Sequence, residues 1–340
     1  MTTLQDEPAM PEHNPSLDEN GDVDHVKVDV LPSQHTRRIN EYHRFALVVI
    51  GGLACVCTSF GAAWNVISGY MQELLNLSQT DLVNINLVGS VFTYFALPYA
   101  FLYDYAGPIP VSIISIVMFV LGSLLFSLAF GGQIRGSVVR LCVFNAIMKT
   151  GCILFDLVGN ITVVSHFPTM RGPTIALLKS FVGIGGAVVS AVQLGFFPEL
   201  DDIKNFYYLL MVYATVMGLL ELAFMRNPRY HLSGYEESYL TEEEKECRRA
   251  TKAQYLRQEP PVWRFAIGYG VILLLVVYLP TQSACVQYMG LGDMHKRTFA
   301  VITVFFLLLI TLVLIPNPVR IFRKRRGDHV RRMTPASPLL

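Results

Sequence analysis

Five polar side chains recur along one apolar stretch of the sequence, between Val138 and Ser165. They follow one another at steps of four, three, four and four residues: Asn145, Lys149, Cys152, Asp156 and Asn160. At about 100° per residue, this spacing predicts that all five share one face of a helix. On such a face Lys149 can bind an anionic group or act as an electrostatic gate, and Asp156 can bind a cation or a proton. The alternative is an ion-pair network between helices that touches no solute.

The two charges of this helix must meet protein or water. An ionised Lys or Asp at the centre of a membrane helix costs about 2.5–3.5 kcal/mol on insertion scales. Lys149 and Asp156 are two turns apart, about 10.5 Å along a helix axis, so neither can bond the other directly. Each therefore needs a partner on another helix, or water. We predict that both face a central cavity, with the first, second and fifth membrane helices as its other walls.

The composition favours a membrane protein with several spans. Of the 340 residues, 52% are hydrophobic and only 16% are charged. Soluble proteins carry roughly 25% charged residues, so the deficit argues against a large soluble core. Five of the six cysteines lie in apolar runs, and we expect them to be small apolar fillers rather than a disulfide framework.

Sequence motifs for other chemistry are absent. The chain holds no nucleotide-binding G-x-x-x-x-G-K-[ST], no H-E-x-x-H and no G-x-S-x-G. Its eight histidines show no metal-ligand spacing. We therefore expect no enzyme activity, no cofactor, no metal site and no nucleic-acid partner. The expected partners are the lipid bilayer and a small-molecule or ion solute.

Eight apolar runs, each near the roughly 20 residues that cross a bilayer, predict an all-α, multi-pass transmembrane bundle. They are Phe45–Tyr70, Leu82–Tyr103, Pro108–Phe130, Val138–Ser165, Pro173–Phe197, Phe206–Met225, Phe265–Tyr288 and Thr298–Ile315. We divide the chain into a disordered acidic tail (1–42), a six-helix bundle (43–226), a charged linker (227–262), two further helices (263–316) and a basic tail (317–340). The third and sixth runs hold no ionisable residue in their central stretch, which is typical of helices at the periphery of two three-helix repeats.

The distribution of lysine and arginine predicts that both termini face the cytoplasm. With that orientation the inner segments hold Arg37, Arg38, Arg44, Arg171 and the dense sets of 226–264 and 320–332. The outer loops hold only Arg135, Arg140, Lys204, Lys296 and Arg297. A receptor-type bundle would require the N-terminus outside.

Three local patterns carry further predictions. Thr241 and Glu244 resemble a capping box, which predicts a solvated helix in the linker, with a structural role favoured over a regulatory one. Pro280 is expected to break the seventh helix. Glu221, near the linker, is expected to reach water or Arg226.

Four other polar residues are candidates for a solute pathway, each with a structural alternative. Asn65 and Asn86 can bond a solute or a neighbouring helix, and Lys179 can face a cavity or extend to the membrane surface. Gln282 follows the expected break at Pro280, where an unwound helix can expose backbone groups for binding. The alternative there is a plain kink with glutamines at the membrane interface. Together with Asn145, Lys149, Asp156 and Asn160, these form our candidate pathway.

The segment HFPTMRGPTIALLKSFVGIGGAVVSA, His166–Ala191, resembles the Nodulin-like branch of the major facilitator superfamily, in particular its trypanosomatid members. It is similar to the family's F-P-x-x-R-G loop and the Leu-Leu-Lys-x-Phe-x-Gly helix start. A weaker match runs from Arg44 to Leu82, and the resemblance covers 44–225 well and 263–315 loosely. It implies a secondary carrier that moves a small solute by alternating access, with Asp104, Gly107 and Arg171 in gating loops. The alternative for Asp104 is that it only caps the start of the next helix.

The sequence departs from that family pattern in two ways. The family's basic loop G-x-x-x-D-R-x-G-R-R is here YDYAGPIP, which keeps Asp104 and Gly107 but no arginine. The superfamily has twelve helices in two bundles, whereas eight apolar runs are present here, so transport would need a partner that supplies the second bundle. The second hypothesis is therefore a truncated, non-transporting membrane protein, either a scaffold or regulator or a gene fragment.

Overall fold

The computed structural model describes residues 39–61, 64–290 and 292–315, so the predictions for residues 1–38 of the acidic tail and for the basic tail lie outside the described residues. Glu41 and Tyr42, which we assigned to the disordered acidic tail, are instead helical. The regular structure of the described part is entirely helical, without strands. Eight of its helical segments are long and apolar enough to cross a membrane. They confirm the predicted all-α multi-pass bundle.

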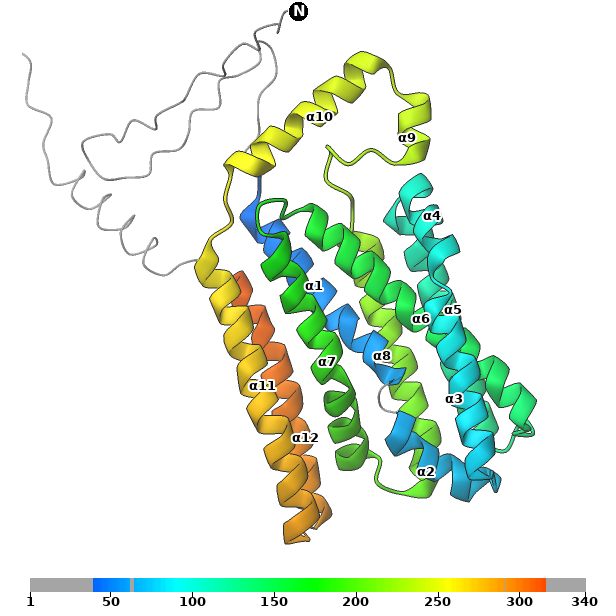
Figure 1. Cartoon of the computed structure of the whole chain (residues 1–340). Helices are drawn as coiled ribbons and strands as arrows, with labels where there is room; N and C mark the ends of the chain where they lie inside the picture. Colours follow the sequence, from blue (N-terminus) through cyan, green and yellow to red (C-terminus); the bar gives the residue numbers. More distant parts are fainter. Residues whose placement is uncertain (1–38, 62–63, 291, 316–340) are drawn as a thin grey trace, which may run out of the picture. The chain divides into compact units, whose positions relative to one another are not determined.

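Twelve α-helices make up the described part of the chain (Figure 1). They are α1 (Glu41–Thr58), α2 (Trp64–Leu75), α3 (Gln79–Tyr94), α4 (Leu97–Ala106), α5 (Pro108–Phe130), α6 (Val138–Ser165), α7 (Arg171–Phe196), α8 (Ile203–Phe224), α9 (Gly234–Tyr239), α10 (Glu242–Arg257), α11 (Val262–Met289) and α12 (Asp293–Leu308). Short 3-10 helices follow α1 (Ser59–Gly61), precede α8 (Leu200–Asp202) and extend α12 (Leu309–Leu314). We call the end of the bundle beneath α9 and α10 the linker end.

Three predicted helices differ from the structure. The first run is divided, because α1 ends at Thr58 and α2 begins at Trp64. The second is divided between α3 and α4, just before Pro98, which lies in the first turn of α4 where its missing N–H is tolerated. The predicted break at Pro280 is wrong, since α11 continues through it. The Thr281 hydroxyl donates to the Val277 carbonyl (2.7 Å) in the same turn.

The predicted linker helix is present as α10. The Thr241 hydroxyl accepts from the Glu244 amide (3.4 Å) and the Glu244 carboxylate accepts from the Thr241 amide (3.2 Å), which completes the capping box. Arg248 pairs with Glu236 of α9 at 2.8 Å. These local contacts fix the start of α10 and its position against α9.

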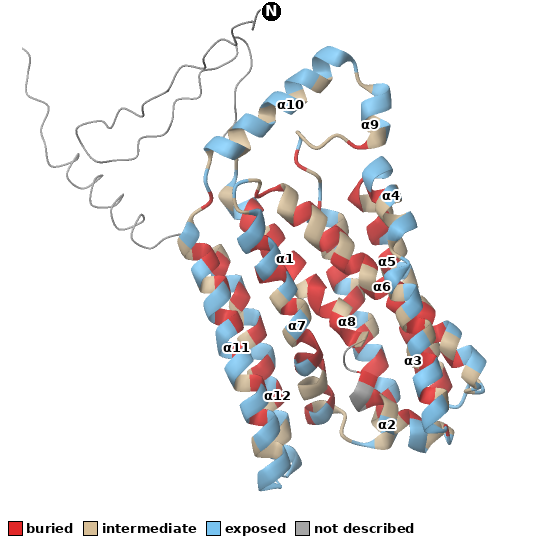
Figure 2. Cartoon of the chain, viewed as in Figure 1, coloured by how far each residue is buried: buried red, intermediate tan, exposed pale blue. Residues whose placement is uncertain are grey.

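Helices α1 and α6 form the interior of the bundle (Figure 2). In the most apolar part of each span, 78% of the residues are buried in the first and 72% in the fourth, against 11% in the α3–α4 span. We expected the third and sixth spans to be the peripheral ones, and instead the second is the most exposed. The reason is packing, because α3 lies mainly against α6 and α4 mainly against α5.

Glycines allow the closest helix contacts around α6. A Cβ on Gly151 would lie 2.5 Å from the backbone nitrogen of Phe119, and one on Gly122 would lie 2.7 Å from the backbone of Met148. Helices α5 and α6 therefore touch backbone to backbone, as small residues permit in membranes. This contact fixes the rotation of α6 and so the direction of its polar face.

Candidate functional site

Lys149 is buried between α6 and α3 and is bound there only by neutral groups. Its ammonium donates to the Asn86 amide oxygen (2.7 Å) and to the Ser90 hydroxyl (3.1 Å). The Asn145 amide donates to the Ile85 carbonyl (2.8 Å), one turn away on the same seam. Among the residues that the structure describes, no carboxylate pairs with Lys149. We call Asn86, Ser90, Asn145 and Lys149 the α3–α6 cluster.

A glycine on α3 makes room for this cluster. A Cβ on Gly89 would lie 2.3 Å from the Asn145 side-chain nitrogen and 2.9 Å from Cδ of Lys149. Any larger residue would push both side chains off the seam. The Asn145 oxygen is buried and has no hydrogen-bond donor in the described part of the chain, so this cluster holds one unused acceptor.

Asp156 pairs with Lys179 across the seam between α6 and α7. The Lys179 ammonium lies 2.8 Å from Oδ1 and 2.5 Å from Oδ2 of Asp156. The Asn160 amide also donates to Oδ1 of Asp156, at 2.7 Å. The side chain of Asp156 is 12% exposed, whereas that of Lys179 is 49% exposed. We call Asp156, Asn160 and Lys179 the α6–α7 cluster.

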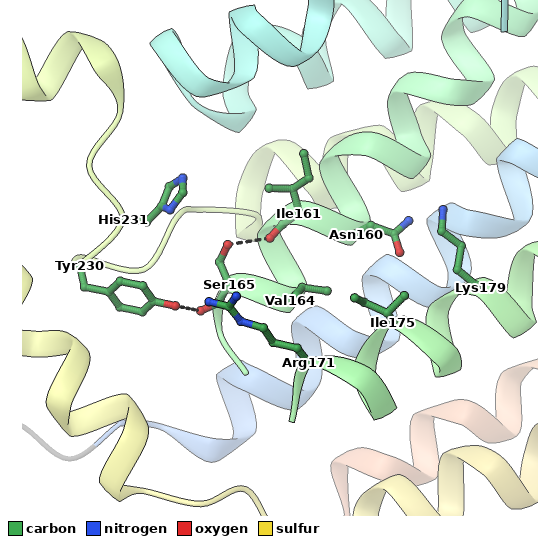
Figure 3. Close-up of a pocket in the computed structure, with 9 residues that line it drawn as sticks. All are labelled: Asn160, Ile161, Val164, Ser165, Arg171, Ile175, Lys179, Tyr230 and His231. Atoms are coloured by element: carbon green, nitrogen blue, oxygen red, sulfur yellow. Dashed lines mark hydrogen bonds between the residues drawn. The ribbon is translucent and has the colours of Figure 1, made fainter. Parts of the chain in front are cut away.

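The two clusters do not bond to each other. Lys149 binds side chains of α3, and Asp156 binds Lys179 of α7. Each therefore has a partner on another helix, as expected for two residues too far apart along α6 to bond each other. A pocket of about 470 Å³ lies beside the second cluster at the linker end (Figure 3). It is lined by Asn160 and Lys179 but by neither Lys149 nor Asp156, so the cavity described here is not the central one that we predicted.

Three segments form the walls of this pocket. Helix α6 contributes Asn160, Ile161, Val164 and Ser165, α7 contributes Arg171, Ile175 and Lys179, and the segment after α8 contributes Tyr230 and His231. The Tyr230 hydroxyl donates to the Ser165 carbonyl and holds the third wall in place. Arg171, the first residue of α7, points into the pocket beside Ser165.

The remaining predicted site residues lie elsewhere. The Gln282 amide oxygen accepts from the Thr303 hydroxyl of α12 at 3.1 Å, in a buried contact between the last two spans. Asp104 is exposed and does not cap α5, whose N-cap is Gly107 with φ +81° and no side-chain bond. The left-handed backbone explains the glycine there. Asn65 lies in α2, and its side chain is outside the described residues.

Glu221 on α8 carries a buried carboxyl group that our sequence analysis placed wrongly. It is fully buried, and neither carboxylate oxygen has a hydrogen-bond partner in the described part of the chain. It lies where α1 and α6 cross, since a Cβ on Gly159 would be 3.7 Å from its Oε1 and 3.6 Å from the backbone of Gly51. The sequence spacing could have indicated this burial. Glu221 continues the steps of three and four residues that place it on one helix face with the buried residues Tyr207, Leu210, Ala214 and Met217.

Arg44 joins three segments at the linker end. Its guanidinium donates twice to the His166 carbonyl (3.0 and 2.6 Å) and once to the Gln258 carbonyl (3.2 Å). It also lies 4.7 Å from the centre of the Phe167 ring. Burial lowers the pKa of the neighbouring His166 imidazole to about 4, although its ring nitrogen lies 2.9 Å from the Thr162 carbonyl. From the sequence we interpreted Arg44 only as one of the positive charges that determine the orientation of the chain in the membrane.

Comparison with known proteins gives one family. A family model described as Nodulin-like matches residues 45–316, which include both clusters and every residue of the pocket. The comparison with curated proteins yields no match.

Proposed function

The chain belongs to the Nodulin-like family, and we propose from this that it carries a small solute across a membrane as a secondary, major-facilitator-type carrier. Family and architecture together fit a membrane transporter, because eight helices are long and apolar enough to span a bilayer. The observation that carries the proposal is the ion pair between Asp156 and Lys179, which lies inside the spans and borders a pocket.

The asymmetry of this pair supports a pathway. A purely structural pair in lipid would be expected to be buried on both sides, because an exposed charge there would face hydrocarbon. Lys179 is instead 49% exposed and lines the pocket. We infer that water or solute reaches it from the linker end. The polar face of α6 then continues the pathway from Asn160 to Lys149 and Asn145.

Alternating access gives the two clusters different tasks. In our proposal the α6–α7 cluster meets solute from the linker end, and the α3–α6 cluster lies on the other side of a closed section of α6. Breaking the Asp156–Lys179 pair would release an ammonium toward the solute as the bundle rearranges. The basic residues near Arg44, Arg171 and the linker support a cytoplasmic linker end, with both termini in the cytoplasm.

Flux measurements test the proposal directly. The full chain would be reconstituted in liposomes and supplied, under an imposed proton gradient, with labelled carboxylates, amino acids and divalent metal ions in turn. We expect uptake of one class, and its loss in Lys179→Gln. Lys296→Gln is the matched control, because among the residues that the structure describes that lysine pairs only with its exposed neighbour Asp293, at 2.8 Å. Absence of flux for every class would favour the non-transporting scaffold instead.

Orientation has its own test. Protease added to sealed, right-side-out vesicles should spare the acidic N-terminal tail if both termini are cytoplasmic. Cleavage of that tail from outside would reverse the assignment and would favour a receptor-type bundle.

A further inference from the structure

The pocket at the linker end has cationic ends and an apolar middle. Arg171 and Lys179 are eight residues apart on α7, about 12 Å along its axis, and both line the pocket. Ile175 lies between them on α7, and Ile161 and Val164 face it from α6 (Figure 3). None of the nine lining residues is acidic.

The two cations are not equivalent. Lys179 is already bound by Asp156, so its charge is largely neutralised. Among the residues that the structure describes, Arg171 has no hydrogen-bond acceptor and no carboxylate partner. An arginine with open donors matches the planar, two-oxygen geometry of a carboxylate. Arg171 is exposed, so among the described residues the pocket with its adjacent Asp156 keeps one positive charge that is balanced by solvent alone, and it lies at Arg171.

We propose that this pocket binds a small organic carboxylate with an apolar body. The carboxylate would lie on the Arg171 guanidinium, within reach of His231, and the apolar body on Ile161, Val164 and Ile175. A volume of about 470 Å³ lies within the range of small-molecule sites, roughly 300–1,000 Å³. That the pocket binds a carboxylate does not depend on the proposed function. Only the identification of this ligand as the transported solute rests on it.

Other ligand classes match the pocket less well. A metal ion or an organic cation would meet Arg171 and Lys179, and the one nearby carboxylate, Asp156, is occupied. Inorganic phosphate would satisfy Arg171 but leave the side chains of Ile161, Val164 and Ile175 without an apolar partner. A neutral solute would leave the charge of Arg171 uncompensated.

Binding to the full chain in lipid nanodiscs, measured by calorimetry, tests the proposal without requiring transport. The probes are isovalerate, benzoate and hexanoate, each paired with its neutral amide, together with acetate and inorganic phosphate. We expect the three apolar acids to bind at least about ten-fold more tightly than their amides and than acetate or phosphate. Arg171→Gln should lose about ten-fold in affinity, and Arg171→Lys should lose less.

Arg140→Gln is the matched control, because Arg140 is an exposed arginine in the first turn of α6, outside the pocket. Unchanged melting temperatures would show that the variants fold. The inference is overturned if no apolar acid binds, if amides bind equally, if phosphate binds best, or if Arg171→Gln binds normally. Carboxylate binding without any flux would leave this inference standing and remove the proposed function; flux of another solute class without such binding would do the reverse.

Discussion

The α3–α6 cluster and the α6–α7 cluster lie on one polar face of the same helix, yet they stabilise charge in opposite ways. Lys149 is 6% exposed and is held by neutral oxygens alone. Lys179 is half exposed and is held by a carboxylate. The first arrangement satisfies hydrogen bonds but leaves a net charge in a closed interior, whereas the second neutralises charge beside a pocket. Residue type alone therefore does not decide which lysine is accessible; the neighbouring helix does.

The largest expected difference between the clusters is in access to water. In a variant without the six native cysteines, Asn160→Cys should react readily with a membrane-impermeant thiol reagent, because residue 160 lines the pocket. Asn145→Cys should not react, because Asn145 is fully buried. Labelling of both positions, or of neither, would remove the distinction between an accessible and a closed cluster.

Removing the pocket lysine should have the largest effect on stability. Lys179→Met leaves the largely buried Asp156 carboxylate without its cation, and we expect a loss of about 3 kcal/mol in the free energy of unfolding. Chemical denaturation of the purified chain in detergent measures it. The double variant Lys179→Met with Asp156→Asn should regain most of the loss, since no unpaired charge is left. A double variant as unstable as the single one would contradict the ion-pair account.

Mild acid should weaken the linker end, beside the α6–α7 cluster. His166 takes up a proton near pH 4 when folded but near 6.5 when unfolded. The contribution of the neutral imidazole to the free energy of unfolding is complete above pH 6.5 and decreases as the pH drops from 6.5 to 4. At pH 5 the free energy of unfolding is lower by about 2 kcal/mol. Hydrogen exchange should show faster opening around 162–171 than around the α3–α6 cluster. His166→Gln should abolish the difference, and its persistence would assign the effect to another group.

The closed cluster should tolerate loss of its charge. Lys149→Met keeps the side-chain volume and removes the desolvation of a buried ammonium, at the expense of two hydrogen bonds to half-buried acceptors. We expect a change of no more than about 1 kcal/mol, much less than for Lys179→Met. The same denaturation assay compares them. An equal or larger loss would show that Lys149 has an anionic partner after all.

The smallest effect is expected at Glu221, the buried carboxyl group outside both clusters. An ionised carboxylate without partners would cost several kcal/mol there, whereas glutamine has nearly the same shape and carries no charge. Glu221→Gln should therefore leave the free energy of unfolding within about 0.5 kcal/mol of the native value. A loss comparable with that of Lys179→Met would mean that the native carboxylate is ionised and paired.

Much of the architecture was predictable from local patterns. Hydropathy gave the eight spans, the helical period gave the polar face of α6, and Thr241 with Glu244 gave the start of α10. The F-P-x-x-R-G segment also gave the family. These signals depend on neighbours within a few residues of one another, because backbone hydrogen bonding and capping are local.

Only the tertiary structure decided which residues meet. The sequence required a partner for Asp156 on another helix or in water without identifying it, and the rotation of α6 against α5 and α7 selected Lys179. The same packing buried Glu221, directed Gln282 toward α12 and left Arg171 facing a pocket. Partners across helices depend on axial offsets of a few ångströms, which are fixed by close contacts such as Gly151 against Phe119 and leave no periodic trace along the chain.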